Sequence, residues 1–231
     1  MNSDFGRVRY VAFDADDTLW KNEDFYHATE VEFGELLDPF VGAETARAEL
    51  AKTESKNMDL LGYGSKALTI SMTETAAALV PGLTAPLVQK VLAIGTRLLR
   101  MPTVLLPGAL QTVQFMMTKT HVFILTKGDL LEQERKYENS PFKQLGINYI
   151  VISGKAPEDY IKLLDEMHIR PDEFMMVGNS PRSDVQAPLS IGACAAYVPY
   201  SITWAHEHTE LEPNPRMIKL DNISELCQYF K

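Results

Sequence analysis

Two aspartates separated by one residue, Asp14 and Asp16, come directly after an apolar run of strand length at 8–13. In such a pair, one carboxylate can attack an electrophile while the other gives or takes a proton. The chain leaves the strand here, which allows the two carboxylates to approach a substrate from different sides. A polar turn with Thr18 as a helix cap accounts for the same residues without chemistry, so this segment alone leaves both interpretations open.

Three later polar segments also follow apolar runs, and their side chains are of the types that bind phosphate or a metal ion. They are Thr126 and Lys127 after the run at 121–125, Lys155 after 149–152, and Gly178, Asn179 and Asp184 after 174–177. Lysines and free amides bind phosphate oxygens, and Mg²⁺ prefers carboxylate, carbonyl and amide oxygens. Each segment alone is typical of an ordinary turn or helix cap. Together they supply a nucleophile, an acid, phosphate ligands and a metal site, the full set for phosphoryl transfer.

These segments can meet only if the apolar runs are neighbouring strands of one sheet. The runs at 8–13, 121–125, 149–152, 174–177 and 193–198 are nearly continuous in apolar character, as in parallel strands covered on both faces. Helical periodicity lies between the later runs, at 130–137, 157–167 and 185–191, and a last short strand precedes a helix at 223–229. This alternation predicts an α/β fold with a doubly wound parallel sheet, in which ligands bind at the carboxyl ends of the strands.

One interval breaks the alternation, because roughly a hundred residues separate the first run from the second, whereas a crossover needs about a dozen. Most of this interval has helical periodicity, with breaks at Pro81-Gly82 and at Pro102. We therefore predict a smaller all-helical domain at 20–101, inserted into a catalytic core made of residues 1–19 and 102–231. A helix at 107–119 returns the chain to the sheet.

Composition argues against several classes of function. The 231 residues carry a formal net charge of −9, which argues against nucleic-acid binding. No apolar stretch reaches the roughly 20 residues of a membrane span. Two cysteines without metal-ligand spacing, and an N-terminal segment unlike a signal peptide, indicate the cytoplasm. His206 and His208 lie in a polar stretch at 204–215, which we interpret as a solvated surface loop and not as a metal site.

The sequence resembles the haloacid dehalogenase-like (HAD) hydrolase superfamily, because the polar segments match that superfamily's motifs in order. The first motif, Asp-x-Asp-x-Thr-Leu, is matched by Asp14, Asp16, Thr18 and Leu19, the hydroxyl motif by Thr126, the lysine motif by Lys155, and the acidic motif by Gly178 and Asp184. Asn179 stands where the acidic motif usually has its first aspartate. The helical insertion resembles the superfamily's cap domain, and the predicted sheet resembles its Rossmann-like core.

The resemblance implies a magnesium-dependent phosphatase that hydrolyses a small phosphorylated metabolite through an aspartyl-phosphate intermediate. Asp14 would be the nucleophile, and Asp16 would be the general acid and base. The implied phosphate ligands are Thr126, Lys127 and Lys155. The implied magnesium ligands are the Asp14 carboxylate, the Asp16 backbone carbonyl and oxygens of Asn179 or Asp184. Asparagine at position 179 removes one negative charge, so we predict a weaker affinity for Mg²⁺ than aspartate would give.

The substrate is less well defined than the chemistry. The first motif resembles the nucleotidase-type branch, so a nucleoside monophosphate is one expected substrate and a sugar phosphate is another. Trp20, Lys21 and His27 follow the first motif and are candidates for contact with the substrate, although we expect Trp20 to seal the cap hinge.

Three other functions remain open: a haloacid dehalogenase, a sugar phosphomutase, and a non-catalytic binding or regulatory protein on the same fold. Asp16 favours the phosphatase over the dehalogenase, because a departing halide needs no acid. Product analysis with a sugar phosphate would separate mutase from hydrolase. The oligomeric state is also open.

Overall fold

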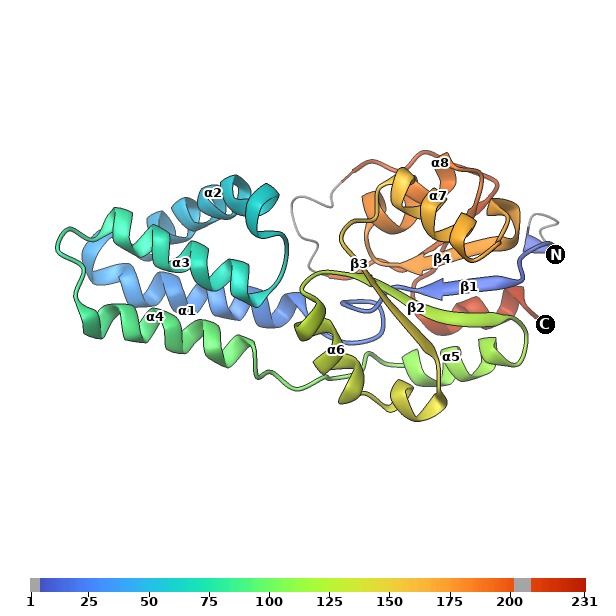
Figure 1. The fold of residues 1–231 in the computed structure, drawn as a ribbon, viewed down its shortest axis with the longest axis horizontal. Coiled ribbons are helices and arrows are strands. Elements are labelled where there is room, and N and C mark those ends of the chain that lie inside the picture. The colour runs from blue at the N-terminus through green and yellow to red at the C-terminus, as the bar shows by residue number, and fades with distance from the viewer. Residues whose placement is uncertain (1–4, 202–208) are drawn as a thin grey trace. The chain divides into compact units, whose positions relative to one another are not determined.

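The computed structural model describes residues 5–201 and 209–231, and its central feature is a six-stranded parallel sheet (Figure 1). The strands are β1 (Tyr10–Phe13), β2 (His121–Lys127), β3 (Asn148–Ile152), β4 (Phe174–Gly178), β5 (Cys194–Tyr197) and β6 (Met217–Lys219). Their order across the sheet is β3-β2-β1-β4-β5-β6, and every neighbouring pair is parallel. The predicted α/β fold with a doubly wound parallel sheet is confirmed.

The first strand lies at the centre, where the direction of winding reverses. Phe13, its last residue, is aligned with Ile124 of β2 on one side and with Val177 of β4 on the other. Asp14 therefore leaves the sheet between the ends of two neighbouring strands. This is the topological switch point at which doubly wound sheets bind ligands.

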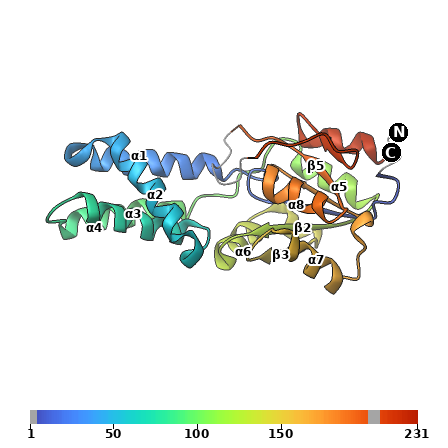
Figure 2. The ribbon, with the colours of Figure 1, turned by 90° about the horizontal axis from the view of Figure 1, so that it is seen from above.

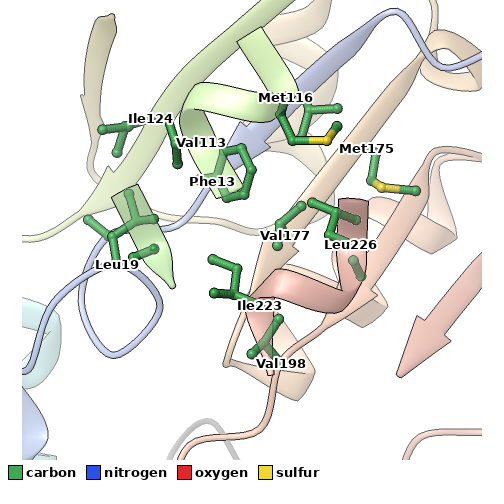
Figure 3. Close-up of a cluster of buried hydrophobic side chains, with 14 of the residues drawn as sticks. Phe13, Leu19, Val113, Met116, Ile124, Met175, Val177, Val198, Ile223 and Leu226 are labelled. Atoms are coloured by element: carbon green, nitrogen blue, oxygen red, sulfur yellow. The ribbon is translucent and has the colours of Figure 1, made fainter. Parts of the chain in front are cut away.

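Alternate side chains of the strands fill two hydrophobic layers. One layer contains Phe13, Ile124, Met175 and Val177 and packs against α5 (Ala109–Met117) and the 3-10 helix η6 (Ile223–Tyr229), as Figure 3 shows. The other layer contains Ala12, Phe123, Leu125, Phe174 and Met176 and packs against α7 (Pro157–Glu166) and α8 (Ala187–Ser190). Burial on both faces explains why these strands read as continuous apolar runs.

The helices of the sheet unit depart from expectation in two places. The sequence predicts an α-helix at 185–191, but the chain forms a π-helix, η4 (Pro181–Gln186), followed by the single turn of α8. The expected C-terminal helix is the 3-10 helix η6. The remaining elements are α6 (Leu130–Glu138) and the 3-10 helices η2 (Pro141–Leu145) and η3 (Pro171–Glu173).

A second compact unit is helical and includes the inserted segment. Its helices are α1 (Glu23–Val41), α2 (Ala43–Leu61), α3 (Ser65–Leu79) and α4 (Ala85–Leu98), which are drawn in blue to green in Figure 2. They share one apolar core that includes Phe33, Leu50, Met72 and Val91. This unit comprises Asp24–Pro102 and also Gly128–Arg135, and the described parts of 1–23, 103–127 and 136–231 form the sheet unit.

The start of α6 and the residue before it, Asp129, belong to the helical unit, and two carboxylates of this segment bind there. Buried Glu132 accepts hydrogen bonds from the Ser65 backbone amide at 2.8 Å and from the Tyr26 hydroxyl at 3.2 Å. Asp129 forms an ion pair with Lys66. The division between the two units therefore falls inside α6, between Arg135 and Lys136.

Within residues 5–201 and 209–231, no helix has the length and apolar character needed to cross a membrane. The part of the expected surface loop that holds His206 and His208 lies outside the described residues.

Candidate active site

The nucleophile candidate Asp14 is buried at the end of β1 and shares a lysine with a second carboxylate. Lys155 Nζ lies 2.5 Å from Asp14 Oδ1 and 2.8 Å from Asp184 Oδ1. The Lys155 side chain is 1% exposed, so its positive charge is held between two acids away from solvent. The structure thus brings together three predicted site residues that are far apart in the sequence.

The charges in this cluster do not balance, because one ammonium group faces two carboxylates. Burial raises the pKa of Asp14, the ion pair with Lys155 opposes this, and the charge of Asp184 adds to it. Burial alone would lower the pKa of Lys155, but Asp14 and Asp184 raise it above its ordinary value. Lys155 therefore stays charged, and a bound cation would favour the ionised form of Asp14 beside Asp184.

Thr18 joins the first and the fourth motif. Its hydroxyl lies 3.1 Å from Asp14 Oδ2 and 3.2 Å from Asn179 Oδ1, and it accepts a hydrogen bond from the Asn179 backbone amide at 3.1 Å. The Asp14 and Asn179 oxygens therefore converge on one hydroxyl group. Because that hydroxyl has a single hydrogen, it cannot fully satisfy both acceptors at once.

The π-helix η4 positions the other fourth-motif side chains. Asp184 Oδ2 accepts the Ser180 backbone amide at 3.0 Å, and Ser180 Oγ accepts the Ser183 amide at 3.0 Å. Lys127 Nζ reaches across from β2 and donates to Ser183 Oγ at 2.9 Å. Single turns of π-helix are frequent at functional sites, and here the turn places Asp184 beside Lys155.

Thr126, the predicted hydroxyl ligand of phosphate, is buried at the end of β2. Its Oγ1 lies 3.4 Å from the carbonyl oxygen of the next residue, Lys127, which is a long contact for a hydroxyl donor. The hydroxyl group is thus held only weakly by the backbone.

The acid–base candidate Asp16 is bound by donors that the sequence did not identify. Lys136 Nζ lies 3.0 Å from Asp16 Oδ1 and 2.9 Å from Oδ2, and Trp20 Nε1 donates to Oδ1 at 2.6 Å. A lysine in the charged helix at 130–137 is typical of a solvated face, so the sequence offered no signal for this contact.

Asp17 is a second residue near the site that the sequence pattern does not predict. It adopts a left-handed conformation with φ of 61°, which aspartate tolerates better than most side chains. Its carboxylate accepts the backbone amides of Asn22, at 2.8 Å, and Glu23, the first residue of α1. Burial, with the charge of Asp16 as the next cause, raises the pKa of Asp17 to about 7.

The donor set suits a hard cation such as Mg²⁺. The oxygens available near Asp14 are its own carboxylate, the Asp184 carboxylate and the Asn179 amide oxygen, and Mg²⁺ prefers oxygen ligands of these types. The described part of the chain contains no cluster of three or more His, Cys, Asp and Glu side chains that could hold a metal ion. A magnesium site here would therefore combine carboxylate with amide and carbonyl oxygens.

The three candidates for substrate contact lie in different surroundings. The Trp20 indole is fully buried in the core of the sheet unit, with its ring centre 6.1 Å from that of Phe142, so it is not exposed to stack on a substrate. Lys21 is partly exposed, and its backbone amide donates to Val104 at 2.9 Å. His27 is exposed on α1 in the helical unit.

Comparison with known proteins agrees with these observations. The family model of the haloacid dehalogenase-like hydrolases matches residues 8–192. A haloacid dehalogenase-like family hydrolase from Xanthomonas campestris is 32% identical, with a TM-score of 0.87 over 96% of this chain and 90% of that chain. No curated protein matches the sequence.

More distant structures share the fold alone. A 2-haloacid dehalogenase from Pseudomonas syringae pv. Tomato DC3000 is 17% identical, with a TM-score of 0.60 over 96% of this chain and 97% of that chain. A predicted phosphoglycolate phosphatase from Haemophilus somnus 129pt is 14% identical, with a TM-score of 0.62 over 97% and 99% of the two chains. The match of the family model over most of the sequence shows that the chain belongs to the haloacid dehalogenase-like hydrolases.

Proposed function

We propose that this hydrolase is a magnesium-dependent phosphatase that cleaves a small phosphate monoester through a covalent intermediate on Asp14. The observation that carries the proposal is a second carboxylate two residues after Asp14. Asp16 is near enough for its charge to help raise the pKa of Asp14, although burial is the largest cause. Displacement of a halide needs no such group, because a halide leaves without a proton.

The two carboxylates have separate tasks in this reaction. In the first step an Asp14 oxygen bonds to phosphorus, the bond from phosphorus to the leaving oxygen breaks, and Asp16 gives that oxygen a proton. In the second step a water oxygen bonds to phosphorus, the bond from phosphorus to Asp14 breaks, and Asp16 takes a proton from the water. Both aspartates return to their initial states, and the products are an alcohol and inorganic phosphate.

The positive side chains account for binding of a doubly charged substrate by an acidic protein. Lys155 and Lys127 would neutralise the phosphoryl oxygens, and the Thr126 hydroxyl would donate to one of them. Lys155 also keeps Asp14 oriented, since it is bonded to one of the two Asp14 oxygens.

Magnesium would be held by the Asp14 carboxylate, the Asp16 backbone carbonyl and oxygens of Asn179 or Asp184. When bound, it supplies positive charge that offsets the negative charge of the phosphoryl group and of the acidic cluster. The resemblance of the polar segments to the superfamily's motifs implies this ion. The proposed substrates are small phosphorylated metabolites of the cytoplasm, nucleoside monophosphates or sugar phosphates.

A panel of phosphate monoesters assayed with and without Mg²⁺ tests the proposal. The wild-type protein should release phosphate from at least one of them, only with Mg²⁺, and Asp14→Asn should abolish the release. Retained activity in that variant would overturn the covalent mechanism. Release of halide from 2-haloacids, without phosphate release from any monoester, would replace the proposal with dehalogenation.

A further inference from the structure

Lys136 lies in the C-terminal part of α6, which belongs to the sheet unit, and it contacts the acid–base candidate Asp16. Its Nζ bonds to both carboxylate oxygens of Asp16 and lies 2.8 Å from Asn22 Oδ1. The two charged side chains are 17% and 21% exposed, which makes this pair partly shielded from solvent. The Lys136 carbonyl accepts a hydrogen bond from Thr103 Oγ1 at 3.0 Å, so its backbone is also held.

A rigid second donor acts on the same carboxylate. Trp20 donates from Nε1 to Asp16 Oδ1, and its indole is buried and packs near Phe142 and Tyr149. Three N–H···O bonds from Lys136 and Trp20 thus use three of the roughly four acceptor positions of a carboxylate. Charge-assisted bonds to both oxygens fix the plane of the Asp16 carboxyl group as well as its place.

Orientation matters for this residue more than for an ordinary surface acid. An aspartate that passes a proton to a leaving oxygen must be within hydrogen-bond reach of it at the moment the bond breaks. Asp16 lies beyond the end of β1 and forms only an isolated β-bridge with Trp20, so the sheet does not fix its side chain. Lys136 and Trp20 provide the restraint that regular secondary structure does not.

We propose that Lys136 is a positioning residue for Asp16, which it holds in the orientation needed for proton transfer to the leaving oxygen. The inference rests on the proposed phosphatase reaction, in which Asp16 is the acid. A lysine that merely stabilised the fold would affect all substrates alike. A lysine that positions the acid affects most strongly those substrates whose leaving group needs a proton.

The test therefore compares leaving groups in wild-type protein, Lys136→Met and Lys136→Arg. The substrates are phenyl phosphate, whose phenol is a poor leaving group, 4-nitrophenyl phosphate and 2,4-dinitrophenyl phosphate, whose phenol leaves without a proton. The parameter is kcat/KM, because it reports the first phosphoryl transfer even if the second step limits kcat. A partly folded preparation lowers all three values by the same factor, so the comparison within one variant does not depend on the folded fraction.

For Lys136→Met we expect kcat/KM to fall about 10- to 100-fold with phenyl phosphate and less than about threefold with 2,4-dinitrophenyl phosphate. Lys136→Arg keeps the charge and should recover part of the loss with phenyl phosphate. In an Asp16→Asn background, Lys136→Met should add no further dependence on the leaving group. Equal losses with all three substrates would overturn the positioning role and make Lys136 a purely structural residue.

Lys143→Met is the matched control. Lys143 is also paired with a carboxylate, that of Glu138, but both are exposed, and neither touches the site. Its substitution should leave all three kcat/KM values within about twofold of wild type. If the wild-type protein shows no Mg²⁺-dependent turnover of any phosphate, the proposed function fails. If it turns them over but the losses are uniform, only the role of Lys136 fails.

Discussion

The carboxylate of Asp184 lies against the backbone of Gly178, in the space that a side chain at position 178 would fill. A Cβ atom built there overlaps the carboxyl carbon and oxygen of Asp184. Gly178 ends β4, and Asp184 follows within the π-helix, so this close approach sets where the acid meets Lys155. The glycine of the fourth motif is thus a steric requirement of the cluster.

Gly178→Ala should displace Asp184 and lower activity. We expect kcat/KM to fall about 10- to 100-fold, since small displacements in an active site have effects of this size. The control is built on Asp184→Ala, which removes the overlapping carboxylate. In that background Gly178→Ala should cost little more, and an undiminished extra loss would mean that the glycine acts in some other way.

Lys155 offers a test of the charge imbalance. Lys155→Met leaves the buried acids Asp14 and Asp184 without their shared cation, and removal of one partner from a buried pair costs roughly 3–5 kcal/mol of unfolding free energy. Millimolar Mg²⁺ should restore part of this stability in urea denaturation, because the ion supplies charge at the same carboxylates. Exposed Lys162 on α7 provides the control, and Lys162→Met should change stability by less than about 0.5 kcal/mol. A Lys155→Met protein as stable as wild type would contradict the buried ion pairs.

The strand ends could be predicted because strands that are buried on both faces of the sheet have continuous apolar sequences. Asp14, Lys155 and Asp184 each follow a continuous apolar run, and parallel strands bring their carboxyl ends to one edge. Residue types and their order along the chain are therefore enough to predict this cluster.

The contacts of α6 could not be predicted in this way. Lys136 and Asp16 are 120 residues apart, and nothing in a charged helix distinguishes a lysine that reaches a carboxylate from one in solvent. The burial of Glu132 is likewise a tertiary effect, since its partners Tyr26 and Ser65 lie on other helices. The same applies to η4, where the side chains of Asp184 and Ser180 accept hydrogen bonds from the backbone amides of Ser180 and Ser183.

Asn179 gives a prediction for metal affinity. Its amide oxygen converges with Asp14 Oδ2 on Thr18, so Asn179→Asp places a carboxylate beside the proposed magnesium site. We expect the Mg²⁺ concentration for half-maximal activity to fall roughly tenfold. Asp184→Asn should raise it by a similar factor. An Asp184→Asn enzyme with an unchanged magnesium requirement would show that Asp184 does not support the metal.

The helical unit contains two partly buried acids, Glu30 and Glu54, whose raised pKa values make the free energy of unfolding depend on pH. Burial, with the charge of Glu30 as the second cause, raises the pKa of Glu54 on α2 to about 7. Burial raises the pKa of Glu30 on α1 as well, against the opposing charges of His27 and Arg47. In the unfolded chain Glu54 ionises near its ordinary pKa of 4.5.

The sign of the effect follows from proton counting. Between pH 4.5 and about 7 the folded protein keeps a proton on Glu54 that the unfolded chain has lost, so stability falls as the pH rises through this window and stays low above it. Glu54→Gln has nearly the same shape and cannot ionise. The difference between the unfolding free energies of Glu54→Gln and of the wild type, measured by urea denaturation, should therefore shift in favour of the variant by about 2–3 kcal/mol between pH 5 and pH 8. Glu49→Gln is the control, because the Glu49 side chain lies on the same helix and is 40% exposed, and it should show no comparable change. A constant difference for Glu54→Gln would mean that Glu54 is ionised in the folded protein throughout this range.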